Sequence, residues 1–477
     1  MIKLYNTLSR QVEEFKPVDD KVKIYTCGLT VYDQPHIGNW TGYIYWDILI
    51  RLLLHNGYKV ERTQNITDVG HLTSDEDTGE DKLEKGARRE GLTAWGIAQK
   101  YIDIANDEAF NILKLVHPDH LVRATDLIQE QIEFAQELEK NNWTYIIPSD
   151  GLYFDTSRLA DYGKLARLDI KGLDAGARVK VDGKKSITDF AIWKLSPTDK
   201  KRDMEWGSPW GKGFPGWHLE CSVIARQTLG DQIDIHTGGI DHIPVHHTNE
   251  ITQTESVTGK QFSRFWLHNN HLKADGQKMS KSVGNIYTLP QIIARGFSPM
   301  DFKLFVLEKH FQTEGNFSWD NLASAHNRLH NWRNYAALRH QIHDTIVDDD
   351  EKDNHDEFLS FHAVNKLLVE QFENNLDTPG AVALIDKALS KIDSTPLGKV
   401  HRSSFVKFLN TIDELTGLEI IDNTPDISET DKKLIIQRKI ARDQQDWAKS
   451  DEVRDQLAQR RITVKDTPSG YVWQYSD

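Results

Sequence analysis

The stretch VKIYTCGLTVYDQPHIGNWTGYIYWDILIRLLLHNGYKVERTQNITDV, residues 22–69, decides the fold class. It begins with a short apolar run, 22–27, which predicts a buried strand that ends at Cys27. A long apolar segment, 39–58, predicts a helix that ends at the Asn-Gly pair near its end. A second run typical of a strand follows at 59–69. Strand, helix and strand of these lengths form a βαβ unit, the beginning of a parallel sheet.

The loop after Cys27 is the first place where a ligand is expected. In parallel α/β sheets, ligands bind beyond the carboxyl ends of the strands. His36, Gly38 and Asn39 lie where the strand gives way to the helix, and a helix N-terminus offers free N–H groups and a dipole that suit phosphate. Gly38 lets a ligand approach the backbone closely. The four residues His-Ile-Gly-Asn also fit an ordinary strand–turn–helix corner, so alone they are a weak signal.

The overall composition is that of a large globular chain. Its 477 residues are too many for one core and predict about two to four domains. No apolar stretch reaches the length of a membrane span, and the N-terminus lacks the apolar centre of a signal peptide. We therefore expect a cytoplasmic protein that does not contact a membrane. The net charge of −14 does not exclude a nucleic-acid partner, because a local basic surface decides that.

The rest of the chain reads as an α/β region followed by helices. Residues 150–215 are rich in Gly, Asp and Lys and predict an irregular αβ insertion, and QIDIHTGG, 232–239, predicts a second buried strand. From about residue 300 the pattern is almost wholly helical, and 344–358 is an acidic run typical of a solvated linker. We expect six segments. The catalytic domain is split into a first half, 1–110, and a second half, 215–285, by an insertion, 111–214. A helical stem-contact region, 286–343, a linker, 344–357, and a helical C-terminal domain, 358–477, follow.

A cationic loop lies in KADGQKMSKSVGN, residues 273–285. Lys278 and Lys281 in such a loop can close over a triphosphate and stabilise the charge that develops on leaving pyrophosphate. A lysine pair in a loop is more often solvated surface. The occurrence of His-Ile-Gly-Asn and Lys-Met-Ser-Lys-Ser together, in this order, is harder to attribute to chance and favours a nucleotide site.

The two cysteines of the chain, Cys27 and Cys221, are far apart in sequence, and a cytosolic disulfide between them is not expected. Two buried free thiols are the simplest interpretation. His246 and Glu250 are four residues apart, so on a helix they share one face and can bind one metal ion. With the cysteines they would form a Cys₂-His-Glu set, whose ligand types favour zinc.

Three other histidines lie close to His246 in the sequence. On a helix His247 faces away from His246, so we do not expect it to share the metal. His236 and His242 remain alternative ligands, because HTGGIDH is itself rich in ligand side chains. The spacing does not match a zinc finger.

Taken together, these segments resemble class I aminoacyl-tRNA synthetases and, among them, the cysteinyl-tRNA synthetases. The resemblance covers essentially the whole chain, through YTCGLTVYD, HIGN, GWHLECS, HHTNE, KMSKS, NLDTP and RKIARDQQDWAKSDEVRDQL. It implies a split Rossmann-type parallel-sheet catalytic domain with an αβ insertion, followed by an all-α C-terminal region. It also implies a ligase that activates cysteine with ATP to cysteinyl-adenylate and then transfers it to tRNA(Cys).

The resemblance assigns roles to particular residues of this sequence. Those implied to act in catalysis are His36, Asn39, Lys278 and Lys281. Those implied to bind ATP, with Mg²⁺, are His36, Gly38, Asn39, Gly239, Asp241, His268 and Lys281. Thr30 and Trp217 are implied to contact the substrate cysteine, and one Zn²⁺ is implied on Cys27, Cys221, His246 and Glu250. Asn39 stands where the signature usually has histidine; it can donate a hydrogen bond but cannot carry charge.

A zinc ion has a chemical purpose in such a site. Cysteine and serine differ by one atom, and an apolar pocket separates such pairs poorly. Zinc binds a thiolate strongly and a neutral hydroxyl weakly, so it can select cysteine without a separate editing step. No segment of the chain demands an editing domain.

The C-terminal segment is modestly basic within an acidic chain. Residues 431–465 carry ten Lys or Arg against six Asp or Glu, which fits either an RNA surface or an ordinary charged helix pair. The candidates for phosphate contacts are Arg438, Lys439, Arg442, Arg460 and Arg461. Trp447 and Trp473 either stack on unpaired bases or pack in the core. The resemblance implies an anticodon-binding domain here, and we expect a monomer.

Three other functions compete with this interpretation. An ATP-dependent ligase that joins cysteine to an amino-sugar thiol precursor shares the catalytic motifs, but it should lack a tRNA-reading C-terminal domain, and the long helical region beyond residue 300 argues against it. A non-catalytic RNA-binding paralogue does not explain the complete metal set and the Lys-Met-Ser-Lys-Ser loop. A zinc hydrolase leaves both nucleotide motifs unexplained.

Overall fold

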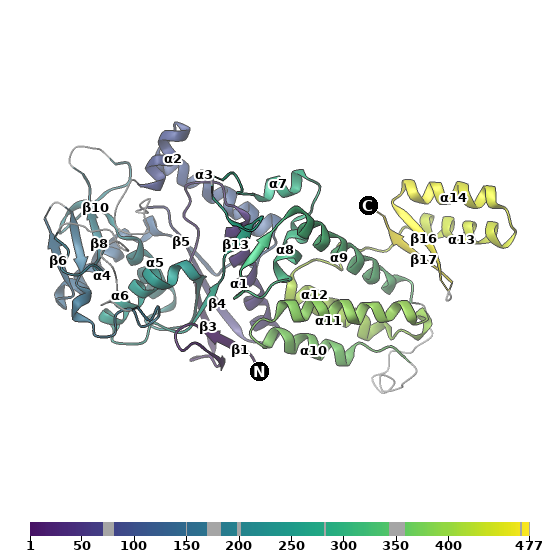
Figure 1. The fold of residues 1–477 in the computed structure, drawn as a ribbon, viewed down its shortest axis with the longest axis horizontal. Helices are drawn as coiled ribbons and strands as arrows, with labels where there is room; N and C mark the ends of the chain where they lie inside the picture. Colours follow the sequence, from purple (N-terminus) through teal and green to yellow (C-terminus); the bar gives the residue numbers. More distant parts are fainter. Residues whose placement is uncertain are drawn as a thin grey trace. The chain divides into compact units, whose positions relative to one another are not determined.

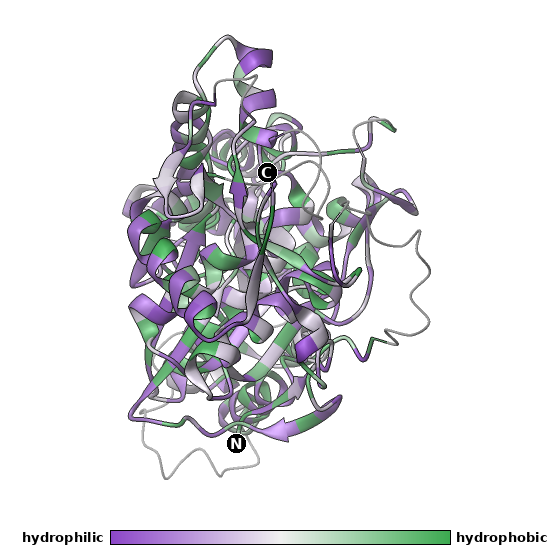
Figure 2. Cartoon of the chain, turned by 90° about the vertical axis from the view of Figure 1, so that its left-hand side faces the viewer, coloured by the Kyte–Doolittle hydropathy of each residue, from purple (hydrophilic) through white to green (hydrophobic). Residues whose placement is uncertain are grey.

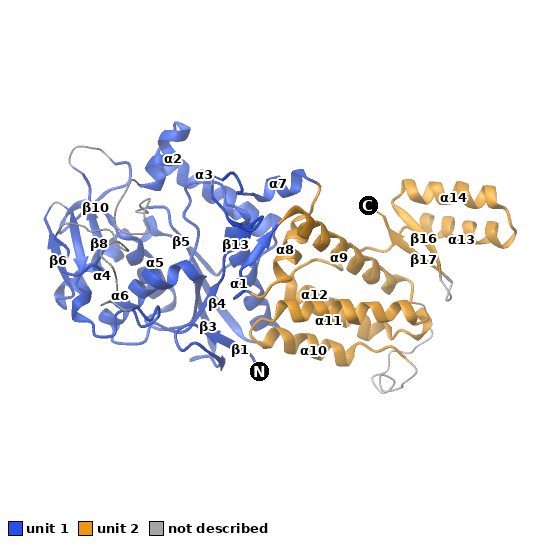
Figure 3. Cartoon of the chain, viewed as in Figure 1, with its two compact units in different colours: residues 1–295, 311–317 blue, residues 296–310, 318–477 orange. Residues whose placement is uncertain are grey.

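The computed structural model describes residues 1–69, 81–148, 150–168, 183–197, 202–280, 283–342, 358–467 and 470–476. Two expectations from the sequence therefore lie outside the described residues: the acidic linker 344–357 and the position of Lys281. The chain divides into two compact units, coloured separately in Figure 3. Unit 1 comprises residues 1–295 and 311–317, and unit 2 comprises 296–310 and 318–477.

Unit 1 is built on a five-stranded sheet in which every pairing is parallel. Its strands, in spatial order, are β12 (Ser263–Asn269), β11 (Ile233–Gly239), β3 (Lys21–Thr26), β4 (Lys59–Ile66) and β5 (His120–Arg123). Numbered along the chain this is the order 5-4-1-2-3, the doubly-wound arrangement of nucleotide-binding sheets. The strand order reverses between β3 and β11, so the ends of these two strands form the crevice where such folds bind ligands.

The predicted βαβ unit is confirmed. Helix α1 (Ile37–His55) connects β3 to β4, and fourteen of its residues are buried, as expected for a helix that is apolar around its circumference. Gly57 follows the helix with φ of +79°, a conformation that glycine adopts without strain, and this ends the helix where the sequence predicted. Helices α2 (Lys82–Glu90) and α3 (Ala94–Asn106), with the turn η1 (Asp107–Ile112), lead from β4 to β5.

Strand β5 corrects one expected boundary. We predicted that the first half of the catalytic domain ends at residue 110, but β5 pairs with β4 in the central sheet, so this half continues to Arg123. The pairing could not be read from the sequence because β5 has only four half-buried residues and no apolar run.

The insertion forms an antiparallel sheet with its own core (Figure 1). Its strands, in spatial order, are β6 (Thr144–Ile147), β7 (Gly151–Phe154), β8 (Phe190–Leu195), β10 (Gly211–Pro215) and β9 (Trp206–Ser208). Helix α4 (Ile128–Lys140) packs on this sheet through the apolar face that its periodicity predicts, including Ile132 and Leu138. Helices α5 (Trp217–Leu229) and α6 (Thr248–Thr258) then precede β11 and β12 respectively.

Smaller elements complete unit 1. Strands β1 (Lys3–Asn6) and β2 (Gln11–Glu14) form a hairpin, and β13 (Leu272–Ala274), β14 (Gln277–Lys278) and β15 (Gly315–Phe317) form a three-stranded sheet. Helix α7 (Leu289–Ala294) follows the cationic loop. Strand β14 thus holds the start of the Lys-Met-Ser-Lys-Ser segment.

Unit 2 is mainly helical, as predicted. Its helices are α8 (Pro299–Leu307), α9 (Trp319–Ala337), α10 (His362–Glu373), α11 (Thr378–Ser390), α12 (Arg402–Thr416), α13 (Glu429–Asp443) and α14 (Trp447–Gln459). The structure adds a feature that we did not predict, a hairpin of β16 (Ile462–Thr467) and β17 (Gly470–Tyr475). Trp473 of β17 packs with Ile435, Val453 and Leu457 of the two preceding helices, so hairpin and helices share one core.

Helices throughout the chain carry hydrophilic and hydrophobic residues interleaved along their length (Figure 2). Among the residues that the structure describes, no helix combines the length and the apolar character needed to cross a bilayer.

Candidate functional site

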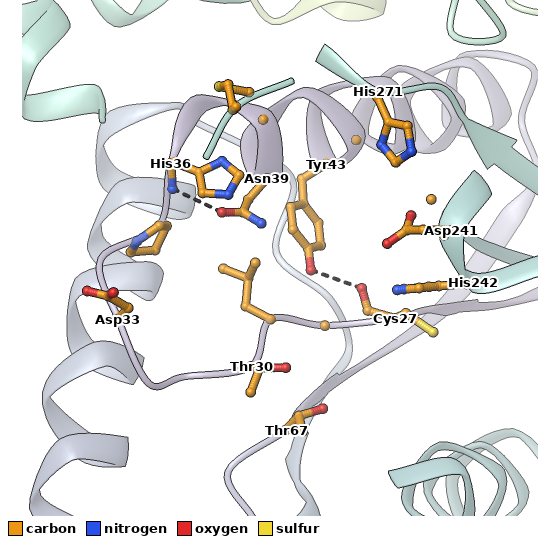
Figure 4. Close-up of a pocket in the computed structure, with 18 of the residues that line it drawn as sticks. Cys27, Thr30, Asp33, His36, Asn39, Tyr43, Thr67, Asp241, His242 and His271 are labelled. Atoms are coloured by element: carbon orange, nitrogen blue, oxygen red, sulfur yellow. Dashed lines mark hydrogen bonds between the residues drawn. The ribbon is translucent and has the colours of Figure 1, made fainter. Parts of the chain in front are cut away.

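A cavity of about 1110 Å³ opens at the crevice between β3 and β11. Its lining comes from segments far apart in the sequence: the loop after β3, the first turns of α1, the turn after β11, and the segment 269–279. Figure 4 shows side chains from these segments pointing into one space. The cavity therefore lies where the doubly-wound order predicts a ligand.

One end of the cavity holds the four predicted metal ligands. Cys27 follows β3, Cys221 lies on α5, His246 is in the turn η6 (Ile243–His247), and Glu250 is on α6. One ligand atom from each lies within 4.8 Å of the others, and His246 Nε2 is 3.0 Å from Glu250 Oε1. All four side chains are buried, while Cys27, Cys221 and His246 also line the cavity. The fold thus brings the four residues together.

The charges in this cluster suit a cation. Burial raises the pKa of the Cys27 thiol, and the hydrogen bond to Cys221 adds to the rise. Burial would also raise the pKa of Cys221, but the hydrogen bond from Cys27 and the nearby His246 lower it to about 6. Burial opposes ionisation of Glu250, yet His236 and His246 hold its pKa well below the usual range. A divalent cation would take the place of the shared protons and stabilise both thiolates.

A second group of potential ligands lies behind the first. Cys27 and Glu250 also lie within 4.8 Å of His236 and His247. Our expectation that His247 faces away is wrong: its Nε2 is 3.2 Å from Cys27 Sγ. The reason is that residues 243–247 form a wide π-type turn, so the angular spacing of an α-helix does not apply to His246 and His247.

The two groups differ in their access to the cavity. Neither His236 nor His247 is among the residues that line it, whereas His246 is. His236 Nε2 instead contacts Glu250 Oε2 at 2.9 Å, and His247 Nδ1 contacts His268 Nε2 at 2.8 Å. A metal ion that binds substrate needs an open coordination position. The set with Cys221 and His246 is the one that offers such a position.

The other end of the cavity is formed by the start of α1. His36 occupies the N-cap position, and its backbone N–H donates to Oδ1 of Asn39 at 3.0 Å, as Figure 4 shows. The Nδ1 atom of His36 is buried and has no hydrogen-bond partner among the described residues. Burial lowers the pKa of His36, which favours the neutral imidazole. The two side chains and the helix N-terminus together suit a phosphate group.

The cationic loop approaches this end of the cavity. Lys278 and Met279 line it, and Met279 Cε would be 2.6 Å from a β-carbon placed on Gly38. Glycine at position 38 therefore leaves room for the loop. The backbone N–H of Ile37 also donates to the carbonyl oxygen of Tyr287 at 2.9 Å, so the segment after the loop is tied to the start of α1.

Four other predicted residues line the cavity: Thr30, Trp217, Gly239 and Asp241. The ring of Trp217 stacks on His246, with centroids 4.0 Å apart, so this aromatic side chain lies against a predicted metal ligand. A β-carbon on Gly239 would lie 2.3 Å from Asp241 Oδ1, and glycine there allows the carboxylate to fold back over the strand end. These positions agree with contacts to the amino acid and the nucleotide.

His268 lies elsewhere. It is buried and is not among the cavity-lining residues, and its Nδ1 atom contacts Thr7 Oγ1 at 2.8 Å while Nε2 contacts His247. Both ring nitrogens are thus engaged in the interior, and the contact of His268 with adenine stays a prediction. The sequence could not reveal this, because the histidine lies on β12 and its partner Thr7 lies near the N-terminus.

Sequence reasoning missed two residues that support the site. The Tyr43 hydroxyl donates to the carbonyl oxygen of Cys27 at 2.9 Å, which links α1 to the metal end (Figure 4). His218 Nδ1 lies 2.9 Å from Nδ1 of His246 and can orient that ring. Tyr43 is four residues after Asn39, on the same helix face, and this spacing was the available signal.

The two tryptophans of the C-terminal segment, Trp447 and Trp473, lie in different environments. Trp473 is buried and packs in the core, whereas Trp447 is 58% exposed and has the guanidinium of Arg442 5.8 Å from its ring. Arg438 is buried beside Asp466, and Arg460 pairs with Asp431 at 3.0 Å. Trp447 is therefore the tryptophan available to a base.

Comparisons with known proteins first define the class. Residues 14–327 match the family model described as tRNA synthetases class I (C) catalytic domain. A solved methionyl-tRNA synthetase from Mycobacterium tuberculosis, in complex with methionyl-adenylate, has a TM-score of 0.58 at 16% identity and covers 84% of this chain and 89% of its own. A putative arginyl-tRNA synthetase from Campylobacter jejuni has a TM-score of 0.52 at 13% identity, covering 86% and 94%. The chain has the catalytic fold of class I aminoacyl-tRNA synthetases.

The particular family follows from closer relatives. Residues 424–473 match the cysteinyl-tRNA ligase anticodon binding domain. A curated cysteine–tRNA ligase 1 from Burkholderia lata is 43% identical over 98% of this chain and 95% of its own length. Cysteine–tRNA ligases from Zymomonas mobilis and Treponema denticola are 38% and 35% identical over 98% and 99% of this chain, and over 97% and 99% of their own lengths. The chain belongs to the cysteine–tRNA ligase family.

Proposed function

We propose that the cavity of unit 1 activates cysteine with ATP and transfers the cysteinyl group to tRNA(Cys). One observation carries this proposal: the Cys₂-His-Glu cluster and the N-terminus of α1 open into the same cavity. A thiol held at one end and a triphosphate held at the other place the carboxylate of the amino acid between them. Membership of the cysteine–tRNA ligase family supports the same reaction.

We assign the ATP end to the residues around α1. His36 and Asn39 would donate to phosphate oxygens, with the helix N-terminus adding its positive dipole end. Gly239 and Asp241 lie at the end of β11, where a carboxylate suits the hydroxyl groups of a ribose. Lys278, and with it Lys281 as an inference from the sequence, would stabilise the leaving pyrophosphate, with Mg²⁺ accompanying ATP.

We assign the other end to a zinc ion and the substrate thiol. Cys27, Cys221, His246 and Glu250 supply two sulfur, one nitrogen and one oxygen ligand, a set typical of zinc. Zinc bound there would attract the thiolate of cysteine and leave the neutral hydroxyl of serine weakly bound. Trp217 would cover the amino acid from the side of His246, and Thr30 would lie beside it.

The reaction needs no covalent intermediate with a side chain of the protein. The carboxylate of cysteine itself attacks the α-phosphate, so the side chains serve to orient the two reactants and to stabilise charge on the phosphates. Neutral His36 would donate a hydrogen bond to a phosphate oxygen without adding a positive charge. No acid or base on the chain is needed for the first step.

We assign tRNA binding to the segment after the cationic loop and to the C-terminal helical region. Residues 286–343 would contact the tRNA stem and 358–477 the anticodon region, with Trp447 stacking on an unpaired base. We expect a monomer as the working unit. Both cysteines are free thiols, as in the reducing cytoplasm, where we place the reaction.

The test is cysteine-dependent exchange of pyrophosphate with ATP, followed by transfer of labelled cysteine to tRNA(Cys). We expect both activities from the full chain. Exchange without transfer would indicate the ligase that joins cysteine to an amino-sugar thiol precursor. Absence of exchange, in the presence of added zinc, would overturn the proposal.

A further inference from the structure

The carboxylate of Glu108 lies between two hydrogen-bond donors that flank His36 in the sequence. Gln34 Nε2 donates to Oε1 at 2.5 Å, and the indole N–H of Trp40 donates to Oε2 at 2.7 Å. Gln34 is two residues before His36, and Trp40 is four residues after it. A single side chain from a distant segment thus holds the chain on both sides of the predicted phosphate-binding residue.

Glu108 comes from the turn η1 (Asp107–Ile112), which continues α3 as a wider π-type turn. Such turns are rare and are often found at functional sites. Glu108 is only 3% exposed and Trp40 only 2%, so the hydrogen bond between them is shielded from water, while Gln34 is half-buried. A buried carboxylate that lost one of these donors would be left with an unpaired oxygen, which is costly.

The position of the His36 ring depends on its backbone. Its Nδ1 atom has no hydrogen-bond partner among the described residues, and its backbone N–H is held by Asn39. The chain on either side of His36 therefore contributes to the direction of its side chain. The contacts of Glu108 with Gln34 and Trp40 fix those flanking segments.

We propose that Glu108 is a positioning residue for ATP: by holding Gln34 and Trp40 it sets the place of His36 and of the helix N-terminus against the phosphates. This inference rests on the proposed assignment of His36 and Asn39 to ATP. It concerns the nucleotide end only, because Glu108 has no contact with the four predicted metal ligands among the described interactions.

The ionisation of Glu108 should make the positioning of His36 depend on pH. Burial raises the pKa of Glu108 to about 7, against the effect of the two hydrogen bonds, and Asp107 on the same turn adds to the rise. Near Gln34, Asp33 and Arg89 lie 3.4 Å apart and compensate each other. Ionised Glu108 accepts from both donors, whereas the protonated acid presents an O–H toward one of them. The positioned form therefore accumulates as the pH rises through about 7.

The test compares Glu108→Gln with an exposed control, Asp103→Asn, which changes an acid to an amide on the neighbouring helix α3. In pyrophosphate exchange we expect Glu108→Gln to reduce kcat/KM for ATP at least about 10-fold, with KM for cysteine changed less than about twofold. Trp40→Phe removes one donor and keeps an aromatic side chain, though a smaller one, and its effect should be smaller in the Glu108→Gln background than in the wild type.

A pH profile and direct ATP binding complete the test. The wild type should gain kcat/KM for ATP as the pH rises through about 7, and Glu108→Gln should lack this limb. Calorimetric titration with ATP alone should show weaker binding to Glu108→Gln, and this measurement stands even where the wild type fails to exchange pyrophosphate. Wild-type ATP binding and an unchanged pH limb in Glu108→Gln would overturn the inference. Equal losses toward ATP and cysteine, or loss of bound zinc, would indicate a general structural role and overturn it as well.

Discussion

The methyl carbon of Met279 lies 2.6 Å from the position that a β-carbon on Gly38 would occupy. Gly38 belongs to the first turn of α1 and Met279 follows strand β14, so the two signature segments of the chain meet at this point. The contact is closer than real β-carbons tolerate, and the ring of His36 is also within 3.0 Å of the same position. Glycine at this position thus leaves room for the Met279 side chain as well as for an approaching phosphate.

Gly38→Ala should therefore affect ATP more than stability. Met279 can shift, since its end is flexible, but the loop then moves away from the phosphates, and we expect kcat/KM for ATP to fall about 10-fold or more. The thermal midpoint should stay within a few degrees of the wild type. Adding Met279→Ala relieves the contact with the loop, and a double variant no better than Gly38→Ala would contradict this explanation.

Asn39 has two separable roles. Asn39→Asp keeps the oxygen that accepts the His36 N–H, so we expect stability close to that of the wild type. The added negative charge should nevertheless repel the phosphates and lower kcat/KM for ATP at least about 10-fold. Asn39→Ala should in addition lose about 0.5–1.5 kcal/mol of unfolding free energy, because the backbone N–H of His36 loses its acceptor. Wild-type ATP kinetics in Asn39→Asp would refute the phosphate assignment.

Cys221→Ser tests the metal assignment. Loss of a thiolate ligand should lower the zinc content of the purified chain, measured by mass spectrometry, and weaken zinc affinity by more than about 100-fold. The preference for cysteine over serine in pyrophosphate exchange should fall with it. Cys27→Ser serves as the matched variant and should behave alike, since both sulfur atoms belong to one cluster. Unchanged zinc content in either variant would exclude that cysteine as a ligand.

Glu108 should also make stability depend on pH. Its pKa is raised from 4.5 to about 7, so between these values the folded chain holds a proton that the unfolded chain has released. The contribution of Glu108 to the stability of the folded state is therefore greatest below pH 4.5 and is lost as the pH rises to about 7. The thermal midpoint of the wild type relative to Glu108→Gln should fall between pH 5 and pH 8. A constant difference would show that the carboxyl does not titrate in this range.

Trp447 should matter for tRNA and not for activation. Stacking of a base on an exposed aromatic ring contributes about 1–3 kcal/mol, so Trp447→Ala should raise KM for tRNA(Cys) about 5- to 150-fold. Pyrophosphate exchange should be unchanged. Leu367→Ala, which removes another exposed apolar side chain of unit 2, is the control and should leave both activities intact. An unaltered KM for tRNA in Trp447→Ala would remove this residue from the interface.

Local patterns were sufficient for the elements that carry the site. The apolar run before Cys27 and the long apolar segment after His36 predicted β3 and α1, because burial on both faces leaves a continuous hydrophobic signal. The identity and spacing of His246 and Glu250 predicted a shared ligand face, and the types of the four ligands predicted zinc. These features depend on residues near one another in the chain, or on chemistry that residue type alone decides.

Tertiary structure decided what no spacing reveals. The wide turn at residues 243–247 brought His247 to Cys27, and β5 joined the central sheet although its four residues carry no apolar pattern. The side chain of His268 contacts Thr7 in the interior. Glu108, which is 68 residues after Trp40 in the sequence, accepts hydrogen bonds from Trp40 and Gln34 on either side of His36. The sequence by itself determined the fold class and the family, and it predicts the ligand chemistry, because these follow from periodicity and residue type. Which buried side chains face the cavity and which stand behind it was decided by packing between distant segments, since burial and hydrogen bonding act in space and not along the chain.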